Sequence, residues 1–228
     1  MSDISEHARR LGLTFTDLDL LGEALTHRSY LNEHKTTKTH NERLEFLGDA
    51  VLELTVTNFL YSKFPNKPEG DLTAYRASLV NTYSLAETAE EIGLNDMLLL
   101  SKGEAKDTGR ARQIILANAF EAVLGALYLD QGYDAASAFV EKHLCPKIDD
   151  IVAKRAWQDA KSRFQELAQE KKGYTPTYKT LSEEGPDHDK QFTVGVYVGS
   201  EAAAKGDGKS KQEAEQAAAQ AALERYGW

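Results

Sequence analysis

The spacing of apolar residues changes once along the chain, and this change limits the folds that the chain can adopt. Up to about residue 153, apolar residues recur every three or four positions, which is typical of helices packed around a common core. Beyond about residue 160, a short helical segment is followed by stretches in which apolar and polar residues alternate, as in strands. The sequence therefore predicts two domains with different architectures.

The boundary between the two domains falls where the helical periodicity is lost. The segment KRAWQDA, residues 154–160, is polar and has no apolar repeat, so we interpret it as a linker. We expect an all-α helical bundle over residues 1–153 and a small α+β domain over residues 161–228. With 41% hydrophobic residues in a chain of 228, there is enough apolar material for a sizeable core.

The periodicity also predicts individual elements in each domain. In the first domain, helices are expected over residues 42–64, 72–92, 114–129 and 135–151, with a polar loop over residues 101–113. The second domain is expected to follow the order α-β-β-β-α. Its expected elements are a helix over 160–172, strands over 177–181, 191–198 and 201–205, and an alanine-rich helix over 209–226.

Charge and cysteine content restrict the function and the compartment. A net charge of −9 disfavours a generally basic nucleic-acid binder, but it allows a local basic patch. The single cysteine, Cys145, rules out an intramolecular disulfide and fits a reducing compartment. No segment reaches roughly 18 uncharged apolar residues, so we expect no membrane contact and a cytoplasmic location.

The segment HNERLEFLGDAVLEL, residues 40–54, combines an apolar helix with clustered acids. On a helix, Glu42, Glu45 and Asp49 fall within an arc of roughly 60°. Gly48 costs a helix about 1 kcal/mol relative to alanine, so we expect a close approach to the backbone there. The apolar residues on the other arc, which we expect to form the core face, are Leu44, Leu47, Ala50, Val51 and Leu54.

A second apolar helix, ILANAFEAVLGALYLD, carries Asn118 and Glu121 three residues apart. Buried polar groups need partners, and clustered carboxylates repel one another unless a cation compensates their charge. Two helices that each present oxygen ligands would suit Mg²⁺, with Mn²⁺ as a substitute. The alternative is a solvated acidic face with Arg43 nearby.

Several segments, taken together, resemble the ribonuclease III family. HNERLEFLGDAVLEL is very similar to the family signature, and other segments resemble family segments in the family order: THRSY, KPEGDLTAYRASLVN and ILANAFEAVLGALYLD. The tail, with GPDH and GKSKQEAEQAAA, resembles the family's double-stranded RNA-binding domain. The resemblance covers nearly the whole chain. It implies a ribonuclease III-type helical bundle followed by a double-stranded RNA-binding domain.

The resemblance implies a homodimeric endoribonuclease that hydrolyses both strands of double-stranded RNA in the processing of rRNA and other precursors. It would leave 5′-phosphate and 3′-hydroxyl ends. Glu45, Asp49 and Glu121 match the family's metal-binding and catalytic carboxylates, and Glu42 and Glu69 match further acids of the active valley. Phe46 is expected to pack into the partner subunit.

Asn118 departs from the family pattern, which normally has aspartate at this position. An amide oxygen can still bind Mg²⁺, but without the negative charge the affinity should fall. Asn118 therefore leaves open an alternative: a double-stranded RNA-binding dimer that cleaves poorly. A helical protein–protein adaptor would leave the acids and the GPDH and GKSK motifs unexplained.

In the second domain, the resemblance assigns side chains to successive features of an RNA duplex. The first helix would contact one minor groove, the GPDH loop the next minor groove, and the start of the last helix the phosphates between them. The residues assigned in this order are Ser162, Gln165 and Glu166, then His188, then Lys209 and Lys211.

Overall fold

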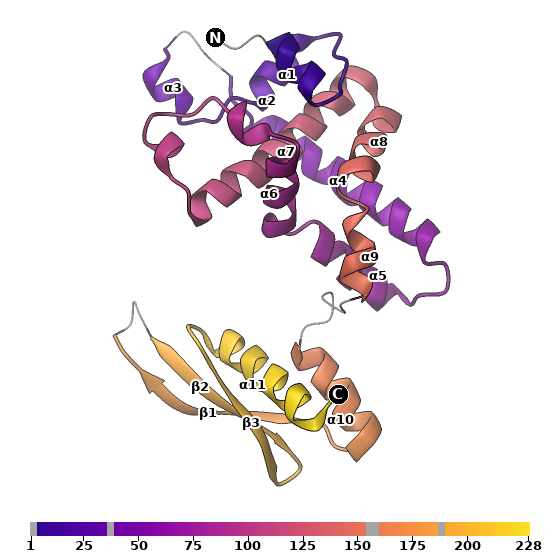
Figure 1. Cartoon of the computed structure of the whole chain (residues 1–228), viewed down its shortest axis with the longest axis vertical. Coiled ribbons are helices and arrows are strands. Elements are labelled where there is room, and N and C mark those ends of the chain that lie inside the picture. The colour runs from indigo at the N-terminus through magenta and orange to yellow at the C-terminus, as the bar shows by residue number, and fades with distance from the viewer. Residues whose placement is uncertain (1–3, 36–38, 154–159, 187–189) are drawn as a thin grey trace. The chain divides into compact units, whose positions relative to one another are not determined.

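The computed structural model of the chain describes residues 4–35, 39–153, 160–186 and 190–228. The chain divides into two compact units, Met1–Trp157 and Gln158–Trp228 (Figure 1). The described part of the first unit is helical, and that of the second is a small antiparallel sheet with two helices, so the predicted fold class is confirmed. The linker predicted over residues 154–160 lies outside the described residues, apart from Ala160.

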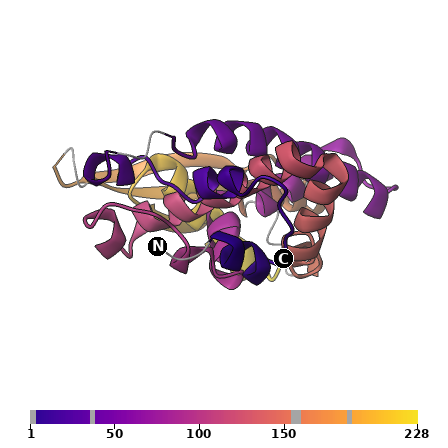
Figure 2. The same ribbon diagram turned by 90° about the horizontal axis from the view of Figure 1, so that it is seen from above.

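The first unit is a bundle in which α4 and α7 pack most extensively against each other (Figure 1), and α4 lies along one side of it (Figure 2). Its helices are α1 (Ile4–Arg10), α2 (Leu18–Ala24), α3 (Tyr30–Glu33), α4 (Glu42–Lys63), α5 (Glu69–Leu79), α6 (Thr82–Glu91), α7 (Arg110–Gln131), α8 (Tyr133–His143) and α9 (Lys147–Ala153). Two short 3₁₀ turns, Leu94–Asp96 and Glu104–Lys106, lie between α6 and α7.

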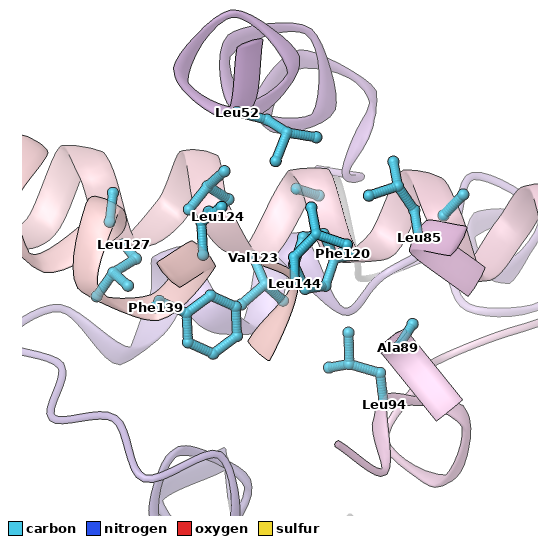
Figure 3. Packing of buried hydrophobic residues seen from close by; sticks show 14 of the residues in the cluster. Leu52, Leu85, Ala89, Leu94, Phe120, Val123, Leu124, Leu127, Phe139 and Leu144 are labelled. Carbon is cyan, nitrogen blue, oxygen red and sulfur yellow. The ribbon is translucent and has the colours of Figure 1, made fainter. Parts of the chain in front are cut away.

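The core of the first unit is built around α7. Leu52 of α4 points toward α7, which contributes Phe120 and Leu124, while Phe139 of α8 packs from another side (Figure 3). By length and composition, α7 is the one helix among the described residues that could span a membrane, but 61% of its apolar window is buried in the protein. Its place in the core accounts for its apolar sequence.

Two helices that were expected to be continuous are broken. The stretch predicted over residues 72–92 is α5 and α6, because Asn81 caps both helix ends. Its side-chain amide donates to Ser78 O (2.9 Å), and its Oδ1 accepts from Ser84 N (3.0 Å). The helix predicted over residues 135–151 ends at His143, ahead of Pro146, which has no N–H to continue the hydrogen-bond ladder.

The predicted core face of α4 is partly wrong. Leu44 and Val51 are buried, but Leu47 is only half-buried, Ala50 is exposed and Leu54 is 58% exposed. The core side of α4 instead contains Gly48, Leu52, Thr55 and Val56. A second apolar strip therefore faces away from the core, and it consists of Phe46, Ala50, Leu54 and Tyr61. We call it the exposed α4 strip.

In the second unit, one face of the sheet is covered by two helices (Figure 1). The elements are α10 (Ala160–Lys172), β1 (Thr177–Glu184), β2 (Gln191–Val198), β3 (Glu201–Gly208) and α11 (Lys211–Tyr226), with strand order β1-β2-β3. The third strand extends through GDG, beyond the predicted end, because Gly206 and Gly208 pair with β2 and let α11 lie directly on them.

Candidate active site and RNA-binding surface

The candidate active site is built on an unusually close crossing of α4 and α7. A Cβ at Gly48 would collide with the backbone carbonyl oxygen of Glu121, and a Cβ at Gly125 would collide with the carbonyl oxygen of Leu44. Gly48 was expected to mark such an approach. Gly125 was missed, although a glycine four residues after Glu121 in an apolar helix was a usable signal.

This crossing brings three of the predicted carboxylates, Glu45, Asp49 and Glu121, close enough for their charges to interact. Glu45 and Glu121 are half-buried and Asp49 is exposed. Burial, followed by the charges of Asp49 and Glu45, raises the pKa of Glu121 from 4.5 to about 7. Burial also raises the pKa of Glu45, with further contributions from the charges of Glu42 and Asp49. A large fraction of Glu121 is therefore protonated at neutral pH when no cation is bound.

Asn118, the departure from the family pattern, interacts directly with this group. Its side chain makes a hydrogen bond to Glu45 that lowers the pKa of that carboxyl, against the effect of burial. Because a carboxylate can only accept, the Asn118 amide must donate when Glu45 is charged. A deprotonated aspartate at position 118 could not make this contact, so Asn118 removes one source of repulsion from the site.

The two further acids predicted for the valley have different surroundings. Glu42 is exposed, and its carboxylate lies 3.5 Å from Arg28 Nη1 and 3.8 Å from His40 Nδ1. Glu69 begins α5, where its Oε1 accepts a hydrogen bond from Thr73 Oγ1 (2.9 Å). The stretch of α4 from Asp49 to Lys63 spans about 21 Å, and α5 follows its far end (Figure 1). Within one chain, Glu69 is thus not brought to the other acids.

The donor set suits a hard divalent cation in its chemistry. Three carboxylates and one amide oxygen match the ligands that Mg²⁺ prefers, and a cation would offset the burial and the neighbouring negative charges that raise the pKa of Glu121. Among the described residues, however, no group of three or more His, Cys, Asp or Glu side chains is already arranged to hold a metal ion. The residues fit Mg²⁺ as donors without forming a ready-made cage.

Phe46, the predicted dimer contact, lies on the surface beside a groove. Its side chain is 81% exposed, which is far more than expected for an aromatic residue of a central helix. The adjacent groove has a volume of about 640 Å³ and is lined by Leu20, Glu23, Glu42, Arg43, Leu44, Phe46, Leu47 and Leu129. The exposed α4 strip, which includes Phe46, therefore forms an apolar surface next to the candidate active site.

In the second unit, the predicted RNA-binding residues lie at two helix starts. Ser162, Gln165 and Glu166 are exposed on the first half of α10. Lys209 and Lys211 are exposed on either side of Ser210, the N-cap of α11. His188 lies outside the described residues. Two acids that the sequence did not single out lie against the lysines: Lys209 N donates to Glu213 Oε2 (2.8 Å), and Lys211 Nζ lies 2.8 Å from Glu183 Oε1.

Comparison with known proteins connects this geometry to a family. Residues 17–148 match the family described as Ribonuclease-III-like, and residues 160–226 match the double-stranded RNA binding motif. Ribonuclease 3 of Bdellovibrio bacteriovorus is 48% identical over 216 residues, which are 94% of this chain and 92% of that protein. Ribonuclease 3 of Enterococcus faecalis is 49% identical over 220 residues, which are 96% of this chain and 95% of that protein.

Solved structures agree with these relatives. The nuclease domain of ribonuclease III from Campylobacter jejuni is 39% identical, with a TM-score of 0.56 over 66% of this chain and 96% of that one. A second structure of that domain, described as flexible in a region involved in dimer formation, is 40% identical, with a TM-score of 0.55 over 62% of this chain and 98% of that one. Because both domains match in the same order and the identity extends over nearly the whole sequence, the chain belongs to the ribonuclease III family.

Proposed function

We propose that the chain is a Mg²⁺-dependent endoribonuclease that hydrolyses both strands of double-stranded RNA and leaves 5′-phosphate and 3′-hydroxyl ends. The observation that carries this function is the coupled acid group of Glu45, Asp49 and Glu121 at the α4–α7 crossing. The match of residues 160–226 to a double-stranded RNA binding motif supports a duplex as the substrate. The expected compartment is the cytoplasm, and the expected substrates include precursors of rRNA.

In this site the ion, when bound, would supply positive charge that offsets the charge of the carboxylates and of the phosphodiester. Glu45 and Asp49 would hold the ion, with the carbonyl oxygen of Asn118 as a neutral ligand. Glu121 would join them as a third carboxylate ligand, and because its pKa is raised to about 7 when no cation is bound, binding of the ion near neutral pH would release a proton from it. Glu42, exposed at the start of α4, would face the RNA.

Cutting both strands calls for two equivalent sites, and a two-fold dimer supplies them. The exposed α4 strip supports this arrangement, since Phe46 is 81% and Tyr61 73% exposed on a helix that borders the acid group. The apolar residues that line the groove beside Phe46 include Leu20 and Leu129. In a two-fold arrangement, each Phe46 could enter the groove of the other copy, which would remove both aromatic rings from water.

A second function, a double-stranded RNA-binding dimer with little cleavage, is favoured by one observation. The Asn118 side chain forms a hydrogen bond with Glu45. It also lacks the negative charge of aspartate, the residue normal for the family, so the site should bind a metal ion less tightly. Weaker metal binding would leave the RNA-binding unit intact while slowing hydrolysis. Binding and cleavage must therefore be measured separately.

The proposed activity is tested by incubating the protein with a labelled duplex and with each of its single strands, with Mg²⁺ and with EDTA. We expect both strands of the duplex to be cut only with Mg²⁺, the single strands to remain intact, and the products to carry 5′-phosphates that a phosphatase removes. Cleavage of single strands, or cleavage in EDTA, would contradict the proposed function. An Asp49→Asn protein prepared in the same way controls for contaminating nucleases.

A further inference from the structure

Two carboxylates, those of Glu213 and Glu183, contact the start of α11, where Lys209 and Lys211 are expected to bind RNA phosphates. Ser210 Oγ accepts a hydrogen bond from Glu213 N (3.1 Å), and Glu213 Oε2 accepts one from Lys209 N (2.8 Å). The first bond is the N-cap of α11, and the second ties the Glu213 side chain to the backbone N–H of the residue before the cap. A protein carboxylate thus already occupies part of the helix end at which a phosphate oxygen could bind.

The Lys211 side chain forms an ion pair with a residue of the sheet, Glu183 of β1. Its Nζ lies 2.8 Å from Glu183 Oε1 on β1 and 5.7 Å from the centre of the Phe192 ring on β2. The Lys211 and Glu183 side chains are 60% and 40% exposed, so the pair is accessible to a macromolecule. The hydrogen bond from Lys211 is the main cause that lowers the pKa of Glu183, which is therefore charged at neutral pH.

We propose that Glu183 competes with RNA phosphate for Lys211, so that binding of a duplex exchanges one anion for the other. This inference rests on the proposed function, because it concerns how the same RNA-binding surface works. Exposed ion pairs are weak, so the exchange lowers the affinity for RNA without preventing binding. The exchange also lowers the salt dependence of binding. Lys211 leaves the Glu183 carboxylate to reach a phosphate, so the number of neutralised charges changes little when the duplex binds.

Glu183 can be replaced without disturbing the start of α11, whereas Glu213 cannot, because its side chain accepts the hydrogen bond from Lys209 N beside the N-cap. The next residue, Glu184, is a matched control. Glu184 pairs with Gln191 and Glu183 pairs with Phe192, so the two neighbours point to opposite faces of the strand. Glu183→Gln and Glu184→Gln change the net charge by the same amount, but only the first releases Lys211.

The experiment measures the affinity of the full-length proteins for a fluorescent duplex of about 16 base pairs, the length that one such domain spans. EDTA is present to prevent cleavage, and the salt concentration is varied. We expect Glu183→Gln to bind about two- to fivefold more tightly than Glu184→Gln at low salt. The slope of log affinity against log salt should become steeper by up to about 1, the effect of one additional phosphate contact.

A double-mutant cycle with Lys211→Gln assigns the effect to this pair. The gain from Glu183→Gln should disappear when Lys211 is already glutamine. Equal binding by Glu183→Gln and Glu184→Gln, weaker binding by Glu183→Gln, or a gain that persists without Lys211 would overturn the inference while leaving the proposed function in place. Failure of every protein to bind duplex at low salt would overturn both. Thermal unfolding of each variant verifies that the domain is folded.

Discussion

Gly48 of α4 and Gly125 of α7 lie against each other's helix, and each occupies a place where any side chain would strike the backbone of the opposite helix. This contact buries Glu121 and brings Asp49, one residue after Gly48, close to it, and burial and the charge of Asp49 both raise the pKa of Glu121. The packing of the core and the chemistry of the site therefore depend on the same two glycines.

Gly48→Ala should destabilise the protein by about 1–3 kcal/mol or more, because the new methyl group would meet backbone atoms that cannot rotate away. Gly22→Ala on α2 is the control, since a Cβ there meets nothing within 4 Å. Guanidinium unfolding measures both. A Gly48→Ala protein as stable as the Gly22→Ala protein would show that the helices do not cross this closely.

Glu121→Gln should change how stability depends on pH. Since the pKa of Glu121 is raised in the folded protein to about 7 from 4.5, folding favours its protonated form. This contribution is fully present below pH 4.5 and is lost as the pH rises through about 7. Glutamine cannot ionise, so in EDTA the variant should become the more stable protein above pH 7, by on the order of 1 kcal/mol after allowance for solvent screening.

Unfolding curves of wild type and Glu121→Gln at a series of pH values between 5 and 8 test this. The difference in their unfolding free energies should grow as the pH rises. Parallel pH profiles would mean that Glu121 has an ordinary pKa and is not coupled to Asp49 and Glu45.

Asn118→Asp should make the metal-free protein less stable and its response to Mg²⁺ larger. The substitution removes the hydrogen bond to Glu45. It also adds a negative charge near Glu45 and Glu121, two carboxyl groups whose pKa values are already raised. We expect a loss of about 1 kcal/mol in EDTA at pH 8, which corresponds to about 2–4 °C in Tm for a protein of this size.

Addition of Mg²⁺ should raise the Tm of Asn118→Asp by more than that of the wild type, because tighter binding stabilises the folded state. Asn58→Asp, the same chemical change at an exposed position of α4, should show no such difference. Identical Mg²⁺-induced shifts in all three proteins would argue against residue 118 as a metal ligand.

The sequence predicted the helix that carries the first acids better than it predicted how the other helices are divided. Glu42, Glu45 and Asp49 could be placed on one helix face because that placement depends only on helix geometry, and α4 spans Glu42–Lys63 as expected. The contact between α4 and α7 is a tertiary property. Gly48 indicated a close approach, and the polar residues on both helices indicated a shared site. Ala50 and Leu54 were assigned to the core because apolar periodicity does not distinguish a surface that faces the core from an apolar surface that faces away from it.

Some predicted element boundaries were wrong, for reasons that are local to the sequence. Asn81 ends one helix and begins the next by hydrogen bonds that a periodicity argument does not detect. GDG was expected to follow the third strand, but glycines at 206 and 208 are needed inside it because α11 lies against them. The separation of Glu69 from the other acids could not be inferred, since a motif gives the order of residues along the chain and not their distance in space.

Phe46→Ala should weaken dimerisation at least tenfold, because each dimer would lose two buried aromatic side chains. Tyr83→Ala on α6 is the control, since Tyr83 is also an exposed aromatic, at 65% compared with 81% for Phe46. Sedimentation analysis over a range of protein concentrations gives the dimer dissociation constants. A wild-type protein that sediments as a monomer, or equal constants for both variants, would contradict the role proposed for the exposed α4 strip.

The most direct test of the proposed function is cleavage of a labelled RNA duplex across a Mg²⁺ titration by wild type, Glu121→Gln and Asn118→Asp. We expect the wild type to cleave, Glu121→Gln to lose at least a hundredfold in rate, and Asn118→Asp to need less Mg²⁺ for half-maximal activity. A wild type that binds the duplex but does not cut it at any Mg²⁺ concentration, while Asn118→Asp does, would show that this chain is an RNA binder disabled at one position.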